Sequence, residues 1–322
     1  MPGKLIKLFL ILLMLSYSVS MNAQIIDPAA TFKTIHQKSY FRFHYDNDFF
    51  TKSDEYYSQG ITLEYVHASL KRNPLSKLLI KPRNSYKQYG ISFNLFGYTP
   101  TSILSDSILF GDRPYAAAID IGSFVSATDT TRKIRISSAI MIGVIGPAGL
   151  GNEIQTGIHR WLKNPLPHGW QYQVQNDVIL NYRVNFEKQL VSWNNHFLLN
   201  GVSEIQLGTL DDRLSAGINF MVGNFNDPYK IKNSKEVQYY FYGQARTNLN
   251  GYDASMQGGL YNRKSPYTIS AGDIERVTFQ ADAGIVVNFK RLYLSYTQSF
   301  LSKEFRSGKY HRWGGFNFGF TL

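Results

Sequence analysis

The 322-residue chain contains no cysteine, and charged residues make up only 18% of it. The lack of cysteine excludes a disulfide scaffold, a thiolate zinc site and a cysteine nucleophile. After residue 19 there is no long apolar run, which excludes a membrane protein built from several hydrophobic helices. The chain instead has 22 tyrosines, 22 phenylalanines and 26 glycines. This composition favours an all-β protein, and a transmembrane barrel is one such case.

The first segment has the pattern of an export signal, which divides the chain into a signal peptide over 1–23 and a barrel domain over 24–322. Lys4 and Lys7 precede a short apolar core at Leu8–Leu15. The alternative is a membrane anchor, but this apolar run is too short to span a bilayer. Loss of the two lysines takes the net charge from +11 to +9, because residues 1–23 hold no acid. A basic exported chain suits lipid headgroups rather than nucleic acid.

Several later segments alternate apolar and polar residues with period two, as half-exposed strands do. The last segment shows this most clearly, with aromatic residues at every second position: Phe316, Phe318 and Phe320. The opposite faces are rich in Ser, Thr, Asn, Gln, Gly and Tyr, as expected of a barrel lumen. A soluble β-sandwich would also alternate. The export signal and the aromatic C-terminal strand favour an outer-membrane barrel.

The predicted fold class is all-β, a twelve-stranded antiparallel outer-membrane β-barrel with a short helix in an extracellular loop. An even strand number is usual for single-chain bacterial barrels and puts both termini on the periplasmic side. Long connections such as 98–113 and 145–170 then lie outside, and short turns such as 127–131 lie inside. Two inside segments, 69–85 and 224–235, are longer than this pattern predicts. The predicted strands are 38–47, 58–68, 86–97, 114–126, 132–144, 171–188, 195–208, 213–223, 236–248, 273–289, 291–301 and 312–322.

One segment, 146–163, has helical periodicity. Its apolar residues recur three or four positions apart: Leu150, Ile154, Ile158, Trp161 and Leu162. Gln155 and His159 are four residues apart and share one face. We expect the apolar stripe either to pack on the barrel rim or to enter the lipid interface with Trp161.

Polar residues at the outer ends of the first two strands form a candidate site. Asp46, Asn47 and Asp48 offer three oxygen-bearing side chains in a row, which suit a hard cation such as calcium. Such a run is more often a turn, and it lacks the ligand spacing of an EF-hand. Strand alternation predicts that Asp46 and Asp48 point inward. Hairpin pairing brings Ser58 opposite Asn47 and Asp48, where it could be a cation ligand, a substrate donor or only a rim residue.

Two basic side chains complete the set of candidates. Arg113 could form an ion pair with Asp112 that locks the rim, or it could bind a phosphate, for which its guanidinium fork is well shaped. His159 could deprotonate a water molecule near physiological pH, although an isolated helical histidine is usually structural. The sequence contains no Gly-x-Ser-x-Gly elbow, no Ser/His/Asp triad that can be assembled and no histidine pair with zinc spacing.

Five blocks of the sequence stand in a characteristic order and spacing. They are Tyr45–Phe50, Tyr56–Gly60, Gly111–Ala116, Gly143–Pro147 and Gln155–Arg160, the last followed by Gly169 and Trp170. Together they resemble the signature blocks of the outer-membrane lipid A 3′-O-deacylases. The resemblance runs from about residue 38 to the C-terminus. Segment 164–168, where that family commonly has a glutamate, contains no acid here.

The resemblance implies a calcium-dependent carboxylic ester hydrolase in the bacterial outer membrane, with its active site facing the extracellular leaflet. Its substrate would be lipid A or lipopolysaccharide, from which it removes the 3′-linked acyl or acyloxyacyl group. Calcium would stabilise the oxyanion, so that no serine nucleophile is needed. We expect no nucleic-acid partner and a monomeric protein.

The resemblance also assigns roles to individual residues. His159 would activate water, and Asn47 and Asp48 would form the calcium or substrate site. Ser58 stands where the family often has threonine, so a hydroxyl is kept. The expected catalytic residues are thus His159, Asn47, Asp48 and Ser58, the expected metal ligands Asp48 and Asn47, and the expected substrate-binding residues Arg113 and Gln155.

Two other functions remain open at this point. The first is a non-catalytic barrel, either a small porin or a structural protein. Twelve strands enclose a narrow lumen that inward side chains would largely fill, which argues against a wide pore. The second is a phospholipase A-like barrel, which would need a serine–histidine arrangement that the sequence does not reveal.

Overall fold

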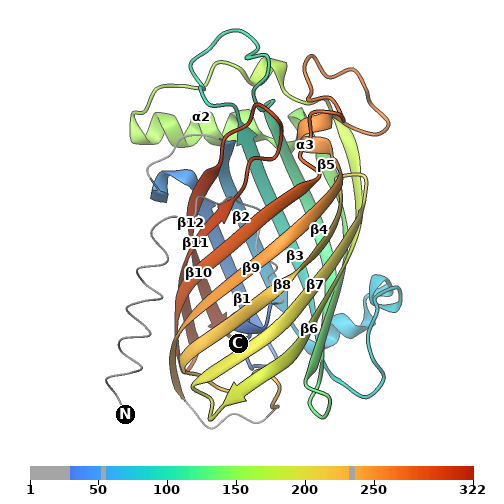
Figure 1. Ribbon diagram of the computed structural model, residues 1–322, viewed down its shortest axis with the longest axis vertical. Coiled ribbons are helices and arrows are strands. Elements are labelled where there is room, and N and C mark those ends of the chain that lie inside the picture. The colour runs from blue at the N-terminus through green and yellow to red at the C-terminus, as the bar shows by residue number, and fades with distance from the viewer. Residues whose placement is uncertain (1–29, 52–55, 232–235) are drawn as a thin grey trace.

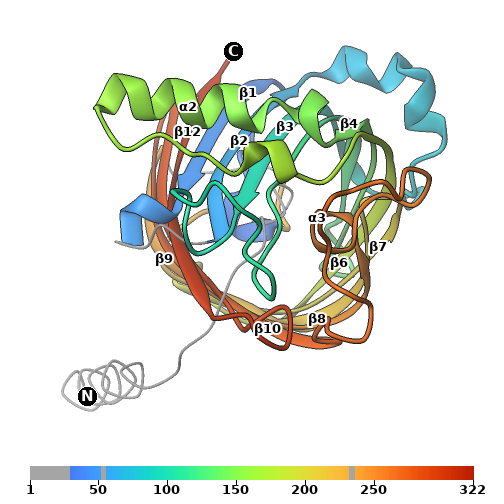
Figure 2. The ribbon, with the colours of Figure 1, turned by 90° about the horizontal axis from the view of Figure 1, so that it is seen from above.

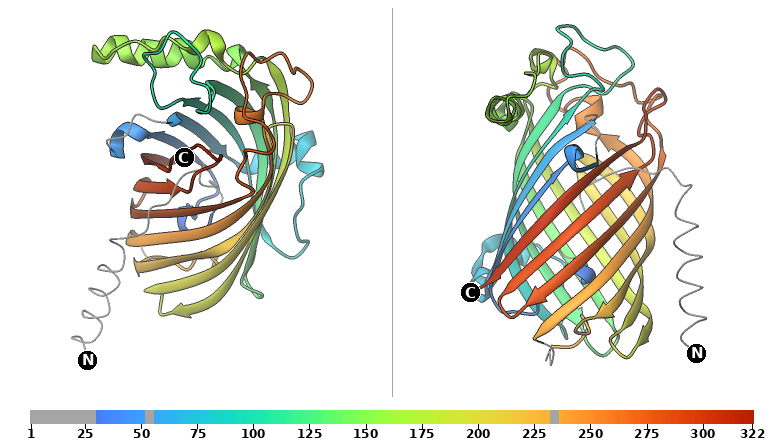
Figure 3. Two further views of the ribbon diagram at one scale, coloured as in Figure 1. Left: turned by 45° about the horizontal axis from the view of Figure 1, so that its top comes forward. Right: turned by 90° about the vertical axis from the view of Figure 1, so that its left-hand side faces the viewer.

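A computed structural model describes residues 30–51, 56–231 and 236–322, and the expected signal segment 1–23 lies outside them. The described chain forms a closed barrel of twelve antiparallel strands, in which each strand pairs with its neighbours in sequence and β1 pairs with β12 (Figures 1 and 3). The predicted fold class and all twelve strands are therefore confirmed. The strands are β1 (Tyr40–Asn47), β2 (Tyr56–Val66), β3 (Tyr86–Thr99), β4 (Ala116–Asp129), β5 (Ile134–Ile145), β6 (Asp177–Trp193), β7 (Phe197–Gly208), β8 (Asp211–Asn224), β9 (Val237–Asp253), β10 (Val277–Phe289), β11 (Leu292–Leu301) and β12 (His311–Thr321).

The two ends of the barrel differ, and we call them the loop end and the turn end. Long connections and the helices α2 (Gly151–Leu162) and α3 (Ala254–Gln257) lie at the loop end, at the top of Figure 1. At the turn end the chain reverses in short turns, where Asn194 and Asn195 both have the positive φ that tight hairpin turns need. Within the described residues, no helix is long and apolar enough to cross a membrane.

The barrel wall has an apolar outer face and a polar inner face, as the alternation predicts. On β12, Phe316 is 50% exposed and Phe318 is 48% exposed, whereas Asn317 between them is 2% exposed. Successive strand residues point to opposite faces, so these phenylalanines face outward and Asn317 faces the lumen. This is the distribution that a barrel in lipid requires.

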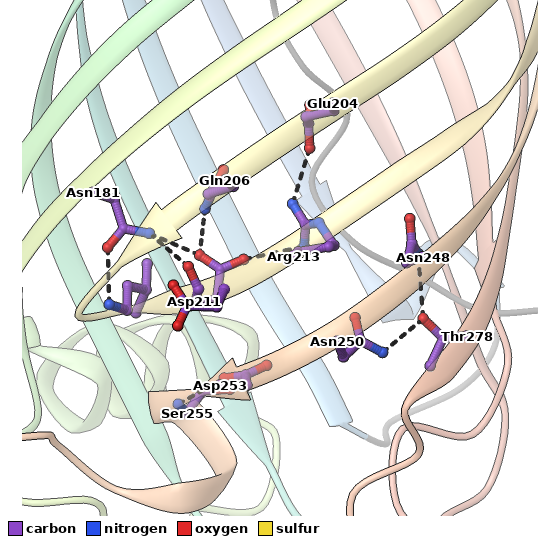
Figure 4. A network of polar contacts seen from close by, with 12 residues as sticks. Asn181, Glu204, Gln206, Asp211, Arg213, Asn248, Asn250, Asp253, Ser255 and Thr278 are labelled. Atoms are coloured by element: carbon purple, nitrogen blue, oxygen red, sulfur yellow. Dashed lines mark hydrogen bonds and ion pairs between the residues drawn. The ribbon is translucent and has the colours of Figure 1, made fainter.

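Charged side chains of the lumen form a connected network (Figure 4). Arg213 lies 3.2 Å from carboxylate oxygens of both Asp211 and Glu204, and Gln206 donates a hydrogen bond to Asp211. Arg246 also pairs with Glu204, at 3.6 Å. Buried charges are stable only when they are paired in this way. The network agrees with the expectation that inward side chains fill the lumen.

A short segment before β1 enters the lumen near the turn end, and we call η1 (Thr31–Lys33) and its neighbours the plug. Phe32 is completely buried and stacks on Tyr242, with 4.2 Å between the ring centroids. The backbone N–H of Thr31 donates to the Glu187 carboxylate at 3.1 Å, and the Tyr240 hydroxyl donates to the Phe32 carbonyl at 2.7 Å. The plug thus gives the polar lumen an apolar core.

The connection between β2 and β3 folds back onto the outside of the wall, in the lower half of Figure 1. It contains two short 3₁₀ helices, η3 (Ala68–Arg72) and η4 (Pro74–Lys77). Asn73 caps the second by accepting a hydrogen bond from the N–H of Leu75, and Pro74 occupies its first turn. This packing explains why the inside connection 69–85 is longer than a barrel turn usually is.

Replacing Phe32 with alanine should open the lumen. The change removes the stacked ring from a fully buried position and should cost about 3–5 kcal/mol of plug and barrel stability. We expect a higher ion conductance in planar lipid bilayers than for the wild type. Phe41→Ala removes an outward ring of β1 and is the control, with conductance unchanged. Equal conductance of wild type and Phe32→Ala would contradict a sealing role.

Candidate functional site at the loop end

Helix α2 lies across the rim, beside the ends of β1, β2 and β3 (Figure 2). The chain enters it through Gly146 and Pro147, and the φ of Gly146 is +106°, which favours glycine. Gly151 has no room for a side chain, because a Cβ there would lie 2.3 Å from Trp170 and 2.5 Å from Ala117. The N-terminal end of the helix is therefore in close contact with the wall.

The apolar stripe of α2 faces away from the wall at the C-terminal end of the helix. Trp161 is 82% exposed and Leu162 is 50% exposed, while Gly151 and Gln155 are the buried residues of the helix. Of the two alternatives for the stripe, packing on the rim does not hold for Trp161 and Leu162, and their exposure is compatible with the other, the lipid interface. The wall instead meets the face with the small glycine, where close approach is possible.

Trp170 joins the helix, the segment after it and the wall. Its Nε1–H donates to Oε1 of Gln155 at 2.7 Å, and its ring lies 4.9 Å from that of Tyr115. The ring edge also borders the open face of Gly97, next to Gln59 of β2. Through Trp170, Gln155, a predicted substrate-binding residue, thus holds the helix beside β2, the strand that carries Ser58.

Asn47 and Ser58 lie in direct contact, as the hairpin pairing predicts. The Asn47 Nδ2 donates to the carbonyl oxygen of Ser58, and its Oδ1 accepts from the N–H of Phe49 at 2.7 Å. The Ser58 hydroxyl shares a 2.7 Å hydrogen bond with the hydroxyl of Thr99 on β3, a neighbour that the sequence analysis did not identify. Asp48 is buried at the start of η2 (Asp48–Thr51), directly after β1.

Asp46 is held from inside the barrel by two hydrogen bonds. Its Oδ1 accepts from the Tyr57 hydroxyl at 2.8 Å, and its Oδ2 accepts from His44 Nε2 at 2.7 Å. Glycines on both neighbouring strands make room for it: a Cβ on Gly60 would lie 2.1 Å from Oδ1, and one on Gly315 would lie 2.9 Å from the Asp46 Cβ. The inward direction predicted for Asp46 is confirmed, and the bond to Tyr57 ties the residue before Asn47 to the residue before Ser58.

His159 is half-buried on α2, and its orientation is fixed by the chain after the helix. Its Nδ1 lies 2.6 Å from the carbonyl oxygen of Pro165. A carbonyl oxygen only accepts, so Nδ1 is the donor in this contact, and in the neutral ring Nε2 then keeps its lone pair. This is the tautomer that a general base needs.

Arg113 points into the lumen and not towards the rim surface. Its guanidinium forms an ion pair with Glu304 and lies 3.9 Å from the centre of the Tyr98 ring. The expected Asp112–Arg113 ion pair is wrong, because Asp112 accepts instead from the N–H and hydroxyl of Thr101, at 2.9 and 2.6 Å. Burial raises the pKa of Glu304 to about 7, against the opposing effect of Arg113. The guanidinium has no exposed surface with which to bind a phosphate.

An acid from another loop contacts the segment after the helix. His168 Nδ1 lies 2.8 Å from Oδ1 of Asp106, which belongs to the connection between β3 and β4. Segment 164–168 itself has no acid. In the parts of the chain that the structure describes, no three His, Cys, Asp or Glu side chains are grouped so as to hold a metal ion.

Comparisons with known proteins identify the family. The family model described as outer membrane protein LpxR matches residues 8–322. No curated protein matches the sequence. The solved structure of LpxR from Salmonella typhimurium is 17% identical and has a TM-score of 0.73, covering 88% of this chain and 100% of that chain. It shows the same fold.

Other solved barrels are less similar. The β domain of the Bordetella autotransporter BrkA is 7% identical over 88% of this chain and 99% of that chain, with a TM-score of 0.46. The translocator domain of NalP from Neisseria meningitidis is 9% identical over 88% of this chain and 87% of that chain, with a TM-score of 0.40. Because the LpxR family model spans nearly the whole sequence, the chain belongs to the family of the outer membrane protein LpxR.

Proposed function

We propose that this protein is a calcium-dependent lipid A deacylase that removes the 3′-linked acyl or acyloxyacyl group. The observation that carries the proposal is the position of His159 on a helix at the rim, where its Nδ1 lies 2.6 Å from the carbonyl oxygen of Pro165 and its Nε2 is left to act as a base. Family membership and the contact between Asn47 and Ser58 support it. In an outer-membrane barrel the long loops face outward, so this rim lies at the level of the outer leaflet.

In the proposed reaction, His159 acts as general base. Its Nε2 takes a proton from a water molecule while the water oxygen attacks the ester carbonyl carbon. The bond to the sugar oxygen then breaks, and the imidazolium returns the proton to that oxygen. The products are a free fatty acid and a sugar hydroxyl. The carbonyl of Pro165 holds the ring in place and stabilises the positive charge that develops on it.

Asp48 and Asn47 are the proposed calcium ligands. The donor set consists of the buried carboxylate of Asp48 and the amide oxygen of Asn47, the residue before it, and such oxygen donors fit a hard cation. Bound calcium would polarise the ester carbonyl and stabilise its oxyanion. The hydrogen bond between Ser58 and Thr99 holds the outer end of β2 against β3, next to Asn47.

Substrate contacts are proposed for Gln155 and for the exposed end of α2. The oxygen of Gln155 is bound to Trp170, so its amide nitrogen is the group proposed to contact lipid A. Trp161 and Leu162 face outward at the end of the helix and would enter the lipid surface there. Arg113 is proposed to hold the rim through Glu304, because contact with a phosphate would require breaking a buried ion pair.

The structure gives less support to the two other functions. The plug and the charged network occupy the lumen that a porin would keep open. A phospholipase-like pair of Ser58 and His159 has no support either, because the Ser58 hydroxyl is hydrogen-bonded to Thr99 and not to His159.

Replacing His159 with alanine should reduce deacylation by about 10²–10⁴-fold, which is the usual contribution of a general base. The measurement is mass spectrometry of lipid A from cells that express each variant. His168→Ala, which removes an exposed histidine bound to Asp106, is the control and should act like the wild type. Equal loss of the acyl group with wild type and His159→Ala would place the base elsewhere.

Removal of calcium with a chelator should abolish deacylation by the purified barrel, and added calcium should restore it. Asp48→Asn removes the only carboxylate of the proposed ligand set, so we expect calcium to bind at least about tenfold more weakly. Calorimetric titration with calcium chloride measures this directly. Asp106→Asn, an exposed acid at the same end, is the control. Full activity in chelator would contradict the metal's role.

Tyr57→Phe removes the hydroxyl that anchors Asp46 and leaves the ring in place. We expect about a tenfold lower kcat with little change in KM, because a small displacement of positioned groups is costly. Steady-state assays on purified lipid A give both constants. Tyr240→Phe removes a comparable buried hydroxyl bond at the plug and is the matched control. If both variants lose activity equally, the effect is one of general stability and the positioning role is wrong.

A further inference from the structure

The connection between β2 and β3 is strongly basic. Residues 68–88 contain six cations and no acid: Lys71, Arg72, Lys77, Lys81, Arg83 and Lys87. The segment lies outside the wall (Figure 2), and along the barrel axis it is near the turn end, whereas the helix that carries His159 is at the loop end (Figure 1). The proposed reaction at the loop end makes no use of it.

Hydrogen bonds fix this basic segment to the wall. Asn73 donates to the Ser123 hydroxyl at 3.2 Å, and the Ser138 hydroxyl donates to the carbonyl of Ile80 at 2.9 Å. The Tyr182 hydroxyl accepts from the N–H of Ile80 at 3.1 Å and donates to the Leu78 carbonyl at 2.9 Å. These polar side chains occupy outward positions of β4, β5 and β6, which would otherwise face hydrocarbon.

Apolar packing fixes the segment further. Leu79 is 4% exposed and packs with three outward residues of the wall: Tyr89, Val125 and Ile140. The two neighbours of Leu79 face away from the wall, and Leu78 is 65% exposed and Ile80 is 51% exposed. The segment therefore extends the apolar outer surface of the barrel through Leu78 and Ile80. Its cations lie beside this apolar surface.

Four of the six cations are exposed: Lys71, Arg72, Lys77 and Arg83. None of these four forms an ion pair with any residue in the described ranges. The other two, Lys81 and Lys87, donate to backbone carbonyls of the segment itself. The exposed charge is thus left without compensation by the described residues.

The position of the segment indicates what compensates this charge. Short turns of outer-membrane barrels face the periplasm, so the turn end lies at the inner leaflet of the membrane. Long cationic side chains beside exposed apolar residues are typical of segments at a lipid–water interface. Turns at the same end add further cations, namely Arg132, which pairs with Asp129, and Lys290 and Arg291.

We propose that segment 68–88 binds the headgroups of anionic phospholipids in the inner leaflet, with Leu78 and Ile80 in the adjoining hydrocarbon. Juxtamembrane Lys and Arg are attracted to anionic lipid, each contributing about fivefold in binding. The exposed Leu78 and Ile80 favour a lipid over a free phosphate ion, because a phosphate ion has no acyl chain to pack against them. This inference does not depend on the proposed deacylase activity.

The test uses the full-length barrel in nanodiscs that contain equal amounts of phosphatidylglycerol and phosphatidylethanolamine. Native mass spectrometry counts the lipids that stay bound. A variant with Lys71, Arg72, Lys77 and Arg83 all changed to Gln loses four charges from the segment. The control changes four exposed cations at the loop end to Gln: Arg160, Lys163, Arg263 and Lys264. Heat-modifiable mobility on gels reports that each barrel is folded.

We expect the wild type and the control to retain phosphatidylglycerol in excess, and the segment variant to lose that excess by more than about tenfold. Equal enrichment in the segment variant and the wild type would overturn the proposal. Displacement of the bound lipid by inorganic phosphate would also overturn it, because the partner would then be a free anion. If the fourfold variant fails to fold, Lys77→Gln with Arg83→Gln is compared with Arg263→Gln and Lys264→Gln by the same criteria.

Discussion

The pairing of β1 with both β12 and β2 is the constraint on which the rest of the structure depends. In hydrocarbon an unpaired backbone N–H or C=O costs several kcal/mol, so the sheet must close on itself. Closure fixes the register, which sets Asp46 opposite Gly60 on one side and Gly315 on the other. Only that register gives the carboxylate room for its bonds to Tyr57 and His44. These bonds inside the barrel therefore also fix the positions of Asn47 and Asp48, which follow Asp46 on the rim.

The sequence predicts the wall well because its signal is local. Alternation along a strand is dictated by lipid on one side and polar lumen on the other, and so all twelve strands could be predicted. The start of β6 is the largest error, six residues early, because Trp170 folds back in a 3₁₀ turn to reach Gln155. The plug could not be predicted, since Phe32 meets a ring 210 residues later in the chain and has no periodic pattern around it.

The candidate site was predictable only in part, for the same reason. Parity gives the direction of Asp46, but β1 ends at Asn47, so the inward direction that alternation predicts for Asp48 in η2 has no strand to rest on. A β-bulge between Tyr57 and Gln59 interrupts the alternation, so the contact of Ser58 with Thr99 does not follow from the sequence. Arg113 pairs with a glutamate 191 residues away, where the neighbouring Asp112 is the obvious local partner. Side-chain contacts between residues far apart in the chain, which only closure of the sheet brings together, cannot be predicted from local sequence patterns.

Closure also separates the two ends of the molecule. The plug, the ion pairs of Arg213 and Arg246, and the stacked aromatic rings fill the space between the rim and the turns. Residues that share no partner and lie more than about 10 Å apart contribute nearly additively to stability. The candidate site at the rim and the basic segment near the turn end can therefore vary independently, each anchored to the same wall. Because the wall needs only alternation and closure, both can be changed without changing the fold.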